Sequence, residues 1–202
     1  MSSKVALGRR LGLKAGDALI VVDVQRDFLP GGTLAVAHGN EIIPAINSYM
    51  AAFAARGLPI FMTRDWHPEH HCSFKESGGI WPRHCVQGTQ GAAWPDDLHL
   101  PAEAHVISKG NDRNAEAYSA FSATALAMLL RNLKVQRVFV GGLATDYCVH
   151  DTVLDARSQG FDVVVLGDAI RPVNMRAEDE TRAIDDMLSH GATLFEHAHA
   201  VF

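Results

Sequence analysis

Long apolar runs are missing from this sequence. None of its apolar stretches approaches the roughly 20 residues that a membrane-spanning helix needs. Residues 1–16 also lack the apolar centre of a signal peptide. We therefore expect a cytoplasmic protein that has no membrane partner.

Cysteine is scarce, and neither sign of charge is in large excess. The three cysteines, Cys72, Cys85 and Cys148, are too few and too irregularly spaced for a disulfide framework, so we expect free thiols in a reducing compartment. The chain has 18 Lys and Arg against 23 Asp and Glu, a formal net charge of −5, and its basic residues form no cluster. This balance excludes the electrostatic footprint of a nucleic-acid-binding protein.

Linkers, internal repeats and low-complexity segments are also absent from the 202 residues. A chain of this length is typical of one domain. Apolar residues make up 48% of it, which is enough to bury both faces of a sheet. We expect a single domain over residues 1–202, with residues 1–15 as a peripheral N-terminal extension of no assigned role.

Short apolar runs alternate with segments of helical periodicity along the chain. The expected strands cover residues 18–22, 59–63, 105–108, 137–140, 162–166 and 193–195, and the expected helices cover residues 40–57, 122–132, 145–158 and 178–190. Asn40 is the expected cap of the first helix. This alternation predicts an α/β fold with a doubly wound, mostly parallel, six-stranded sheet and helices on both faces, as in Rossmann-like proteins.

Four reactive side chains follow the predicted strands. Asp23, Asp65, Lys109 and Cys148 each lie at or just after a strand end, and the carboxyl ends of parallel strands share one edge of the sheet. Thr145 is the expected cap of the helix in whose first turn Cys148 lies, where the helix dipole favours a thiolate. The alternative is that Cys148 is a small buried apolar residue.

This set of side chains is suited to thiol-based acyl transfer. A free cysteine is only a few per cent ionised at neutral pH, so a neighbouring group must take its proton. Asp23 is the candidate base and Lys109 its partner, because His150 points elsewhere on the helix. Backbone N–H groups in the turn over residues 142–145 are candidates for stabilising an oxyanion.

The long loop after the second predicted strand contains a second cluster. Asp65 and His67 come directly after the strand, and His84 arrives from a returning loop. Carboxylate and imidazole ligands at such spacing suit one divalent ion, Zn²⁺, Mn²⁺ or Fe²⁺, with open positions for water or substrate. Two alternatives remain, which are polar surface histidines and a Cys/His zinc site that includes Cys72 and Cys85.

Six motifs between about residues 17 and 197 together resemble the nicotinamidases, a group within the isochorismatase-like cysteine hydrolases. They occur in the family's order, and the set is highly specific. The motifs are Asp23-Val24-Gln25-Arg26-Asp27-Phe28, Asp65-Trp66-His67-Pro68, Trp81-Pro82-Arg83-His84-Cys85-Val86-Gln87-Gly88-Thr89, Ser108-Lys109-Gly110, Tyr118-Ser119-Ala120-Phe121 and Gly142-Leu143-Ala144-Thr145-Asp146-Tyr147-Cys148-Val149.

The resemblance implies an isochorismatase-like fold and hydrolysis of nicotinamide to nicotinate and ammonia, a step of NAD salvage, with pyrazinamide as a further substrate. Cys148 would be the nucleophile, Asp23 the general base and then acid, and Lys109 the third member of a triad. The backbone N–H groups of Ala144 and Cys148 would form the oxyanion hole, beside a cis peptide bond between Leu143 and Ala144.

The resemblance also implies a metal site and a substrate pocket. One divalent ion, Zn, Mn or Fe, would be held by Asp65, His67 and His84, with His71 as an additional candidate ligand. The pyridine ring would lie between two aromatic side chains, Phe28 and Trp81.

Rival functions differ in the motifs that they lack. Related hydrolases of N-carbamoylsarcosine and ureidoacrylate lack this set of metal histidines, and isochorismatases lack the cysteine. A protein of another class, a metal-binding or nucleotide-binding module without catalytic activity, is a further alternative. The sequence argues against it, because no Gly-x-Gly-x-x-Gly motif follows any predicted strand. The sequence leaves the oligomeric state open, with a homo-oligomer among the alternatives.

Overall fold

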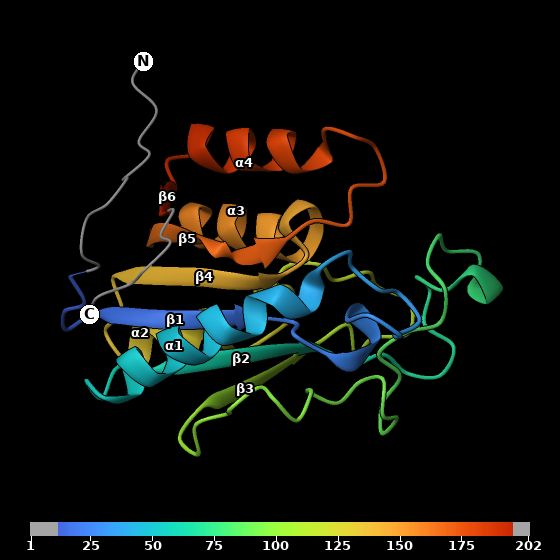
Figure 1. Cartoon of the computed structure of the whole chain (residues 1–202), viewed down its shortest axis with the longest axis horizontal. Coiled ribbons are helices and arrows are strands. Elements are labelled where there is room, and N and C mark those ends of the chain that lie inside the picture. The colour runs from blue at the N-terminus through green and yellow to red at the C-terminus, as the bar shows by residue number, and fades with distance from the viewer. Residues whose placement is uncertain (1–11, 196–202) are drawn as a thin grey trace.

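Six parallel strands form the centre of the protein, as the sequence predicts (Figure 1). The computed structural model of the chain describes residues 12–195. The strands are β1 (Asp17–Val22), β2 (Ile60–Asp65), β3 (His105–Lys109), β4 (Arg137–Leu143), β5 (Asp162–Arg171) and β6 (Thr193–Phe195). Each predicted strand is present, and β4 and β5 extend further than predicted.

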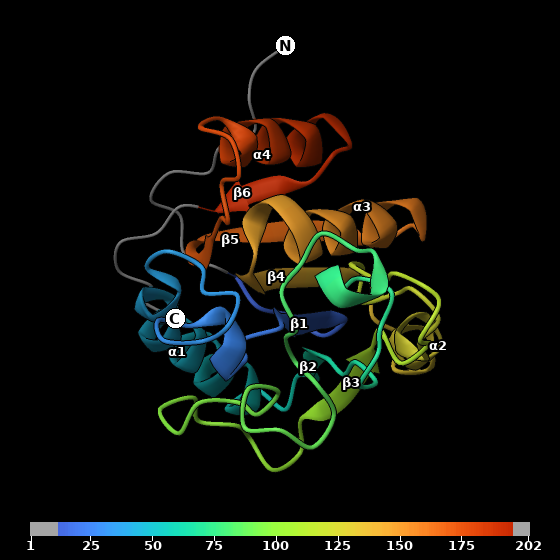
Figure 2. The same ribbon diagram turned by 90° about the vertical axis from the view of Figure 1, so that its right-hand side faces the viewer.

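The strand order places a switch point in the middle of the sheet. The order is β3-β2-β1-β4-β5-β6, so the chain first builds outward from β1 to β3 and then returns to the other side of β1 with β4. In such sheets the crevice outside the carboxyl ends of the two central strands is the usual ligand site. Figure 2 shows the molecule from this edge, with the long loop between β2 and β3 in front of the strand ends.

Helices cover both faces of the sheet, as predicted (Figure 1). Helix α1 (Ile43–Ala54) lies on one face, and α2 (Leu126–Asn132), α3 (His150–Ser158) and α4 (Asp179–Ser189) lie on the other. Because successive side chains of a strand point to opposite faces, Leu19 and Val21 of β1 pack with α1, whereas Ile20 packs with α2 and α3.

The predicted helix caps are wrong at two positions. Residues Gly39–Ile42 form a 3-10 turn, and α1 begins at Ile43 with a proline in its first turn, so Asn40 is not the cap. Proline favours this place because it has no backbone N–H to leave unpaired. Ala144, not Thr145, precedes the π-helical turn Thr145–Val149 that runs into α3.

The predicted start of α2 is also too early. Residues 122–125 form turns, in which the Thr124 hydroxyl donates to the Ala120 carbonyl at 2.6 Å and accepts from the Leu126 N–H at 3.2 Å. Such local bonds between a threonine and the backbone compete with the helical pattern.

Glycines that resemble a turn in the sequence are part of β4. Gly142 has φ +127, and a Cβ atom there would lie 2.0 Å from the backbone oxygen of Val22. Only glycine therefore allows β4 to run this close to β1. The close approach brings the ends of the two central strands together at the switch point.

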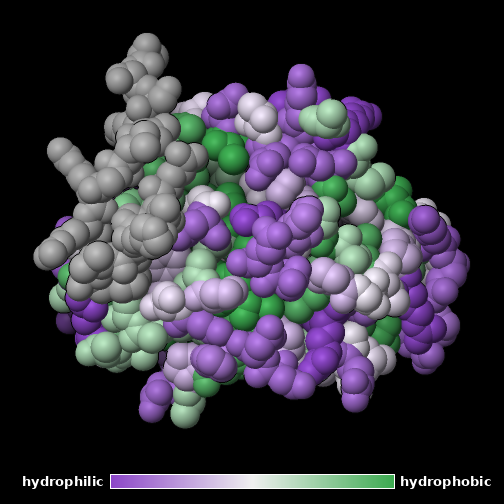
Figure 3. All heavy atoms as spheres, in the orientation of Figure 1, coloured by the Kyte–Doolittle hydropathy of each residue, from purple (hydrophilic) through white to green (hydrophobic). Residues whose placement is uncertain are grey.

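No helix within residues 12–195 is long and apolar enough to cross a membrane. Hydrophilic residues dominate the face in Figure 3, with apolar residues scattered among them. Most of the expected N-terminal extension over residues 1–15 lies outside the described residues.

Candidate active site

The four reactive side chains meet at the carboxyl ends of the central strands. Asp65 and Lys109 are the last residues of β2 and β3 and are direct partners in the parallel pairing. Asp23 follows β1 in the left-handed conformation, with φ 46. Its carboxylate accepts a hydrogen bond of 2.6 Å from the Thr63 hydroxyl, which itself accepts one of 3.2 Å from the Asp23 N–H. These bonds hold the carboxylate at the sheet edge.

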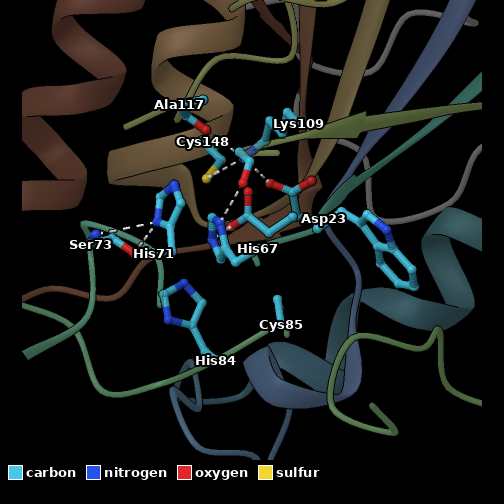
Figure 4. Close-up of polar contacts among 12 residues, drawn as sticks. Asp23, His67, His71, Ser73, His84, Cys85, Lys109, Ala117 and Cys148 are labelled. Carbon is cyan, nitrogen blue, oxygen red and sulfur yellow. Dashed lines mark hydrogen bonds and ion pairs between the residues drawn. The ribbon is translucent and has the colours of Figure 1, made fainter. Parts of the chain in front are cut away.

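Lys109 connects the nucleophile candidate to two carboxylates (Figure 4). Its ammonium group is fully buried, 2.9 Å from Asp23 Oδ2 and 2.5 Å from Asp65 Oδ1. The same nitrogen is 3.4 Å from Cys148 Sγ and donates to the Ala117 carbonyl at 3.1 Å. The predicted trio of thiol, carboxylate and cation is therefore brought together around one buried nitrogen.

Burial and charge determine the protonation state of this cluster. Burial raises the pKa of Asp23 and raises that of the Cys148 thiol well above its usual range. Burial alone would lower the pKa of Lys109, but the two carboxylates outweigh it and the net change is a rise. Burial alone would raise the pKa of Asp65, but Lys109 and the nearby histidines lower it below its usual range. Burial therefore favours the neutral form of the Cys148 thiol and opposes the thiolate that a helix-start position favours.

A second group of side chains fits a divalent ion. One ligand atom from each of Asp65, His67 and His84 lies within 4.8 Å of the others, and all three residues are buried. The Nδ1 atoms of His67 and His84 lie 3.1 and 2.8 Å from the carbonyl oxygens of Gly110 and Pro82. A carbonyl can only accept, so each Nδ1 carries the proton and each Nε2 keeps its lone pair for a metal.

His71 lies beside this group and not within it. Its ring stacks on that of His67 with centroids 4.1 Å apart. Nδ1 accepts from the Ser73 N–H at 3.2 Å, and Nε2 lies 3.1 Å from the Ala115 carbonyl oxygen, so both ring nitrogens are engaged. In this arrangement His71 supports His67 from one side.

The two other cysteines do not join either group in the part of the chain that the structure describes. Cys85 is buried, and its backbone N–H donates to Asp27 Oδ2 at 2.7 Å. Cys72 is half-buried and also belongs to neither cluster. The alternative of a Cys/His zinc site therefore has no support in the geometry.

A narrow cavity opens onto Cys148 and Asp65. Both predicted ring-binding residues line it, and its other walls are mostly apolar; the lining includes Phe28, Leu34, Val36, Trp81, His84, Tyr118, Ala144, Tyr147 and Val173. The Trp81 indole N–H donates to the Tyr118 hydroxyl at 2.8 Å, and the Tyr147 ring meets Trp81 edge-on at 5.0 Å. Sequence reasoning assigned no role to either tyrosine, although both lie within the quoted motifs.

The turn before Cys148 has the backbone form that the resemblance implies. The peptide bond between Leu143 and Ala144 is cis. Ala144 lines the cavity together with Cys148. The assignment of their N–H groups to an oxyanion hole stays a prediction.

The strand order, the triad geometry and the Asp/His/His group agree with one further observation. Residues 17–199 match the family described as "Isochorismatase domain". The chain belongs to the isochorismatase family. The isochorismatase-like fold that the resemblance implied is therefore confirmed.

Known proteins similar to this isochorismatase-family chain include nicotinamidases and pyrazinamidases. The nicotinamidase of Escherichia coli (strain K12) is 38% identical over 199 residues, which cover 88% of this chain and 93% of the relative. The solved structure of the pyrazinamidase of Pyrococcus horikoshii in complex with zinc has a TM-score of 0.86 at 49% identity, covering 90% of this chain and 99% of its own. The structure of PnC1 from L. infantum in complex with nicotinate has a TM-score of 0.84 at 40% identity, covering 90% and 93%.

His150 lies close to Cys148 in the sequence but faces another helix. Its Nδ1 is 2.8 Å from Asp151, and its Nε2 is 2.8 Å from Asp186 of α4. The hydrogen bond to Asp151, together with Asp186, raises the pKa of His150 above 6.5 despite partial burial. The groove around it also contains the charged residues Asp146, Arg176, Asp179 and Arg182. His150 thus joins α3 to α4 and takes no part in the cysteine cluster.

We expect His150→Gln to lower the free energy of unfolding by about 1 kcal/mol near pH 6. A raised pKa means that the charged histidine stabilises the fold fully below 6.5 and that this contribution is lost as the pH rises through the folded-state pKa. The difference from the wild type should therefore shrink at about pH 9, which urea unfolding at both pH values measures. Equal losses at the two pH values would contradict the ion-pair account.

Proposed function

We propose that the chain is a nicotinamidase that hydrolyses nicotinamide to nicotinate and ammonia in NAD salvage, and that it also deamidates pyrazinamide. The observation that carries the proposal is the buried Lys109 nitrogen, which lies within 3.4 Å of Asp23, Asp65 and Cys148 beside an aromatic-lined cavity. The names of the relatives support the choice of a pyridine or pyrazine carboxamide as substrate.

The cavity walls would bind and orient the substrate ring. Phe28 and Trp81 are both nearly buried and supply flat apolar surfaces, with exposed fractions of 8% and 5%. The hydrogen bond from Trp81 to Tyr118 fixes the indole plane. A ring held by these side chains would direct its carboxamide towards Cys148, which lines the same cavity, and would exclude bulk water.

In the first half of the reaction, Cys148 Sγ attacks the carboxamide carbon while Asp23 takes the thiol proton. The N–H groups of Ala144 and Cys148 stabilise the tetrahedral oxyanion. Asp23 then gives its proton to the leaving nitrogen, the C–N bond breaks, and ammonia and a thioester result. Asp23 suits both roles because its pKa is raised by burial.

In the second half, water attacks the thioester carbon and Asp23 takes the proton from that water. The C–S bond breaks, Asp23 returns the proton to the Cys148 sulfur, and nicotinic acid leaves and loses its remaining proton to water as nicotinate. Lys109 stays charged throughout, because the carboxylates raise its pKa, and it holds Asp23 beside the sulfur.

Asp65, His67 and His84 would hold one divalent metal ion. When bound, such an ion would supply a Lewis acid that could polarise a ligand nitrogen or water. Carboxylate and imidazole ligands suit Zn²⁺, Mn²⁺ and Fe²⁺ alike, so the proposal covers all three ions. The role of the chain's own residues is to keep both Nε2 lone pairs directed into the site.

Metal removal tests the proposal directly. We expect stripping with a chelator to lower ammonia release from nicotinamide to less than about a tenth, and re-addition of Zn²⁺, Mn²⁺ or Fe²⁺ to restore it. Pyrazinamide should behave in parallel. His84→Ala should lose the metal response, whereas His70→Ala, which removes an exposed histidine of the same loop, should keep it.

Three results of this assay separate the alternatives. Release that is unchanged after stripping would contradict the role of the metal. Absence of release from nicotinamide with every ion would contradict the proposed function, and the carbamoyl and ureido substrates of related hydrolases would then be assayed. Metal binding without ammonia release from any small amide would favour a silent binding module.

A further inference from the structure

Gln25 is a fully buried residue whose side-chain amide bonds only to the backbone of other segments. Its Nε2 donates to the carbonyl oxygens of Asp65 at 2.8 Å and Ala92 at 2.9 Å. Its Oε1 accepts from the Asp65 N–H at 2.7 Å. The exposed fraction of Gln25 is 0%, so no water replaces these partners. Both donors of the amide are used, and the two bonds to Asp65 form a closed pair.

This pair of bonds replaces a strand neighbour that is missing. Pairing of β1 with β2 reaches Val21 and Met62, and the chain then leaves the sheet at Asp23. Asp65 lies three residues beyond Met62, paired with β3 on one side only. On its other side, the Gln25 amide satisfies both its N–H and its C=O, as an adjacent strand would.

The third bond of Gln25 attaches the end of β2 to the loop over residues 90–95. The same loop is joined to the segment after β1 by bonds from the Arg26 N–H to Ala93 and from the Asp27 N–H to Gly91. The segment after β1 is therefore fixed between the end of β2 and this loop. A displacement of Gln25 would affect both.

Asp65 belongs to both clusters of the site. Its carboxylate lies against Lys109 and is also within 4.8 Å of ligand atoms of His67 and His84. The position of its backbone sets where that carboxylate points. Within residues 12–195, the Gln25 side chain supplies the hydrogen bonds that hold both the N–H and the C=O of Asp65.

We propose that Gln25 is a positioning residue that fixes the Asp65 backbone, and through it the carboxylate shared by Lys109 and the divalent ion. This inference rests on the proposed function for its kinetic part, because it assigns Asp65 to the same site. Gln25 acts through Asp65, and its effect should therefore appear in metal affinity as well as in turnover.

The test compares two substitutions with a matched control. Gln25→Met keeps an unbranched side chain of similar length without the amide. Gln25→Glu keeps the shape but replaces the Nε2 donor with an oxygen, which would face the carbonyl oxygens of Asp65 and Ala92. The control is Gln87→Met, because the exposed Gln87 amide donates to the carbonyl of Trp66, the residue after Asp65, at 2.8 Å.

The first readout is the affinity of metal-stripped protein for Zn²⁺ alone, by competition with a chromogenic chelator and without substrate. We expect the Zn²⁺ dissociation constant of Gln25→Met to rise at least about ten-fold, as for other residues that orient metal ligands. The Gln87→Met control should stay within about two-fold of the wild type. In metal-saturated protein, kcat for nicotinamide should fall more than KM changes.

Several outcomes would overturn the inference. Folded Gln25 variants with wild-type Zn²⁺ affinity would show that Gln25 only stabilises the fold, even if their melting temperatures fall. Failure of both variants to fold would lead to the same conclusion. If the wild type released no ammonia while Gln25→Met still lost Zn²⁺ affinity, the proposed function would fail and the positioning role would stand.

Discussion

Replacing Cys148 with alanine is expected to lower kcat for nicotinamide hydrolysis by at least about 10⁴-fold, the order seen when a catalytic nucleophile is removed. The sulfur lies 3.4 Å from Lys109 and faces the cavity with an exposed fraction of 6%. Among the described residues, no other cysteine lines that cavity. Ammonia release under saturating nicotinamide measures the loss.

Substrate binding should survive this substitution. The proposed binding surfaces, Phe28 and Trp81, are untouched in Cys148→Ala, and alanine is smaller than cysteine, so the cavity stays open. Titration of the variant with nicotinamide, followed calorimetrically, should give a measurable dissociation constant. The control is Cys72→Ala, a half-buried thiol outside both clusters, with a rate within about two-fold of the wild type. Normal turnover by Cys148→Ala would disprove the assignment of the nucleophile.

The sequence predicts that the reactive side chains lie close together, because the strands of a parallel sheet all end at the same edge. Strand ends in such a sheet share one edge, so placing Asp65 and Lys109 at strand ends already implied that they lie on the same edge. Their direct pairing is a finding of the structure. The apolar runs before these residues predict the strands, so the prediction of a shared edge needs no knowledge of side-chain packing. The order of the strands, by contrast, was not predicted, because it depends on contacts between segments that lie far apart in the sequence.

Protonation could not be predicted from the same pattern. The position of Cys148 at a helix start favours a thiolate, but its pKa is raised because the sulfur is buried, an effect that depends on every segment covering it. His71 shows that metal ligation is equally hard to predict, because it too depends on contacts with distant segments. The resemblance made it a candidate fourth ligand, yet Ser73 and Ala115 engage both ring nitrogens, and Ala115 lies 44 residues further along the chain.

Side chains that bond to distant backbone groups were also missed. The Gln25 amide reaches Asp65, 40 residues away, and Ala92, 67 residues away. Such contacts have no period in the sequence, because one polar residue among the charged residues that follow a strand looks like any turn residue. Only the resemblance included Gln25, which lies inside the first motif.

The second large effect is expected for Asp23→Asn, which should lower kcat/KM at least about 10³-fold while the fold keeps its stability. The amide cannot take the thiol proton or return one to the leaving nitrogen. Its oxygen can still face Lys109, and its NH₂ group can then donate to the Thr63 hydroxyl, which donates to the carboxylate in the wild type. Lys109 also retains its ion pair with Asp65.

The free energy of unfolding distinguishes a catalytic carboxylate from a structural one among the buried carboxylates at the two ends of β1. Burial disfavours the charged form of Asp23, so its replacement by a neutral amide should change the free energy of unfolding by less than about 1 kcal/mol. Asp17 is a matched control, because it is buried at the opposite end of β1 and pairs with Arg137 at 2.7 Å. Asp17→Asn should lose about 1–3 kcal/mol of stability and keep turnover within about two-fold. Loss of turnover without loss of stability in Asp23→Asn, and the reverse in Asp17→Asn, would identify Asp23 as the catalytic base; urea unfolding and ammonia release measure the two quantities. Wild-type turnover by Asp23→Asn would exclude that role.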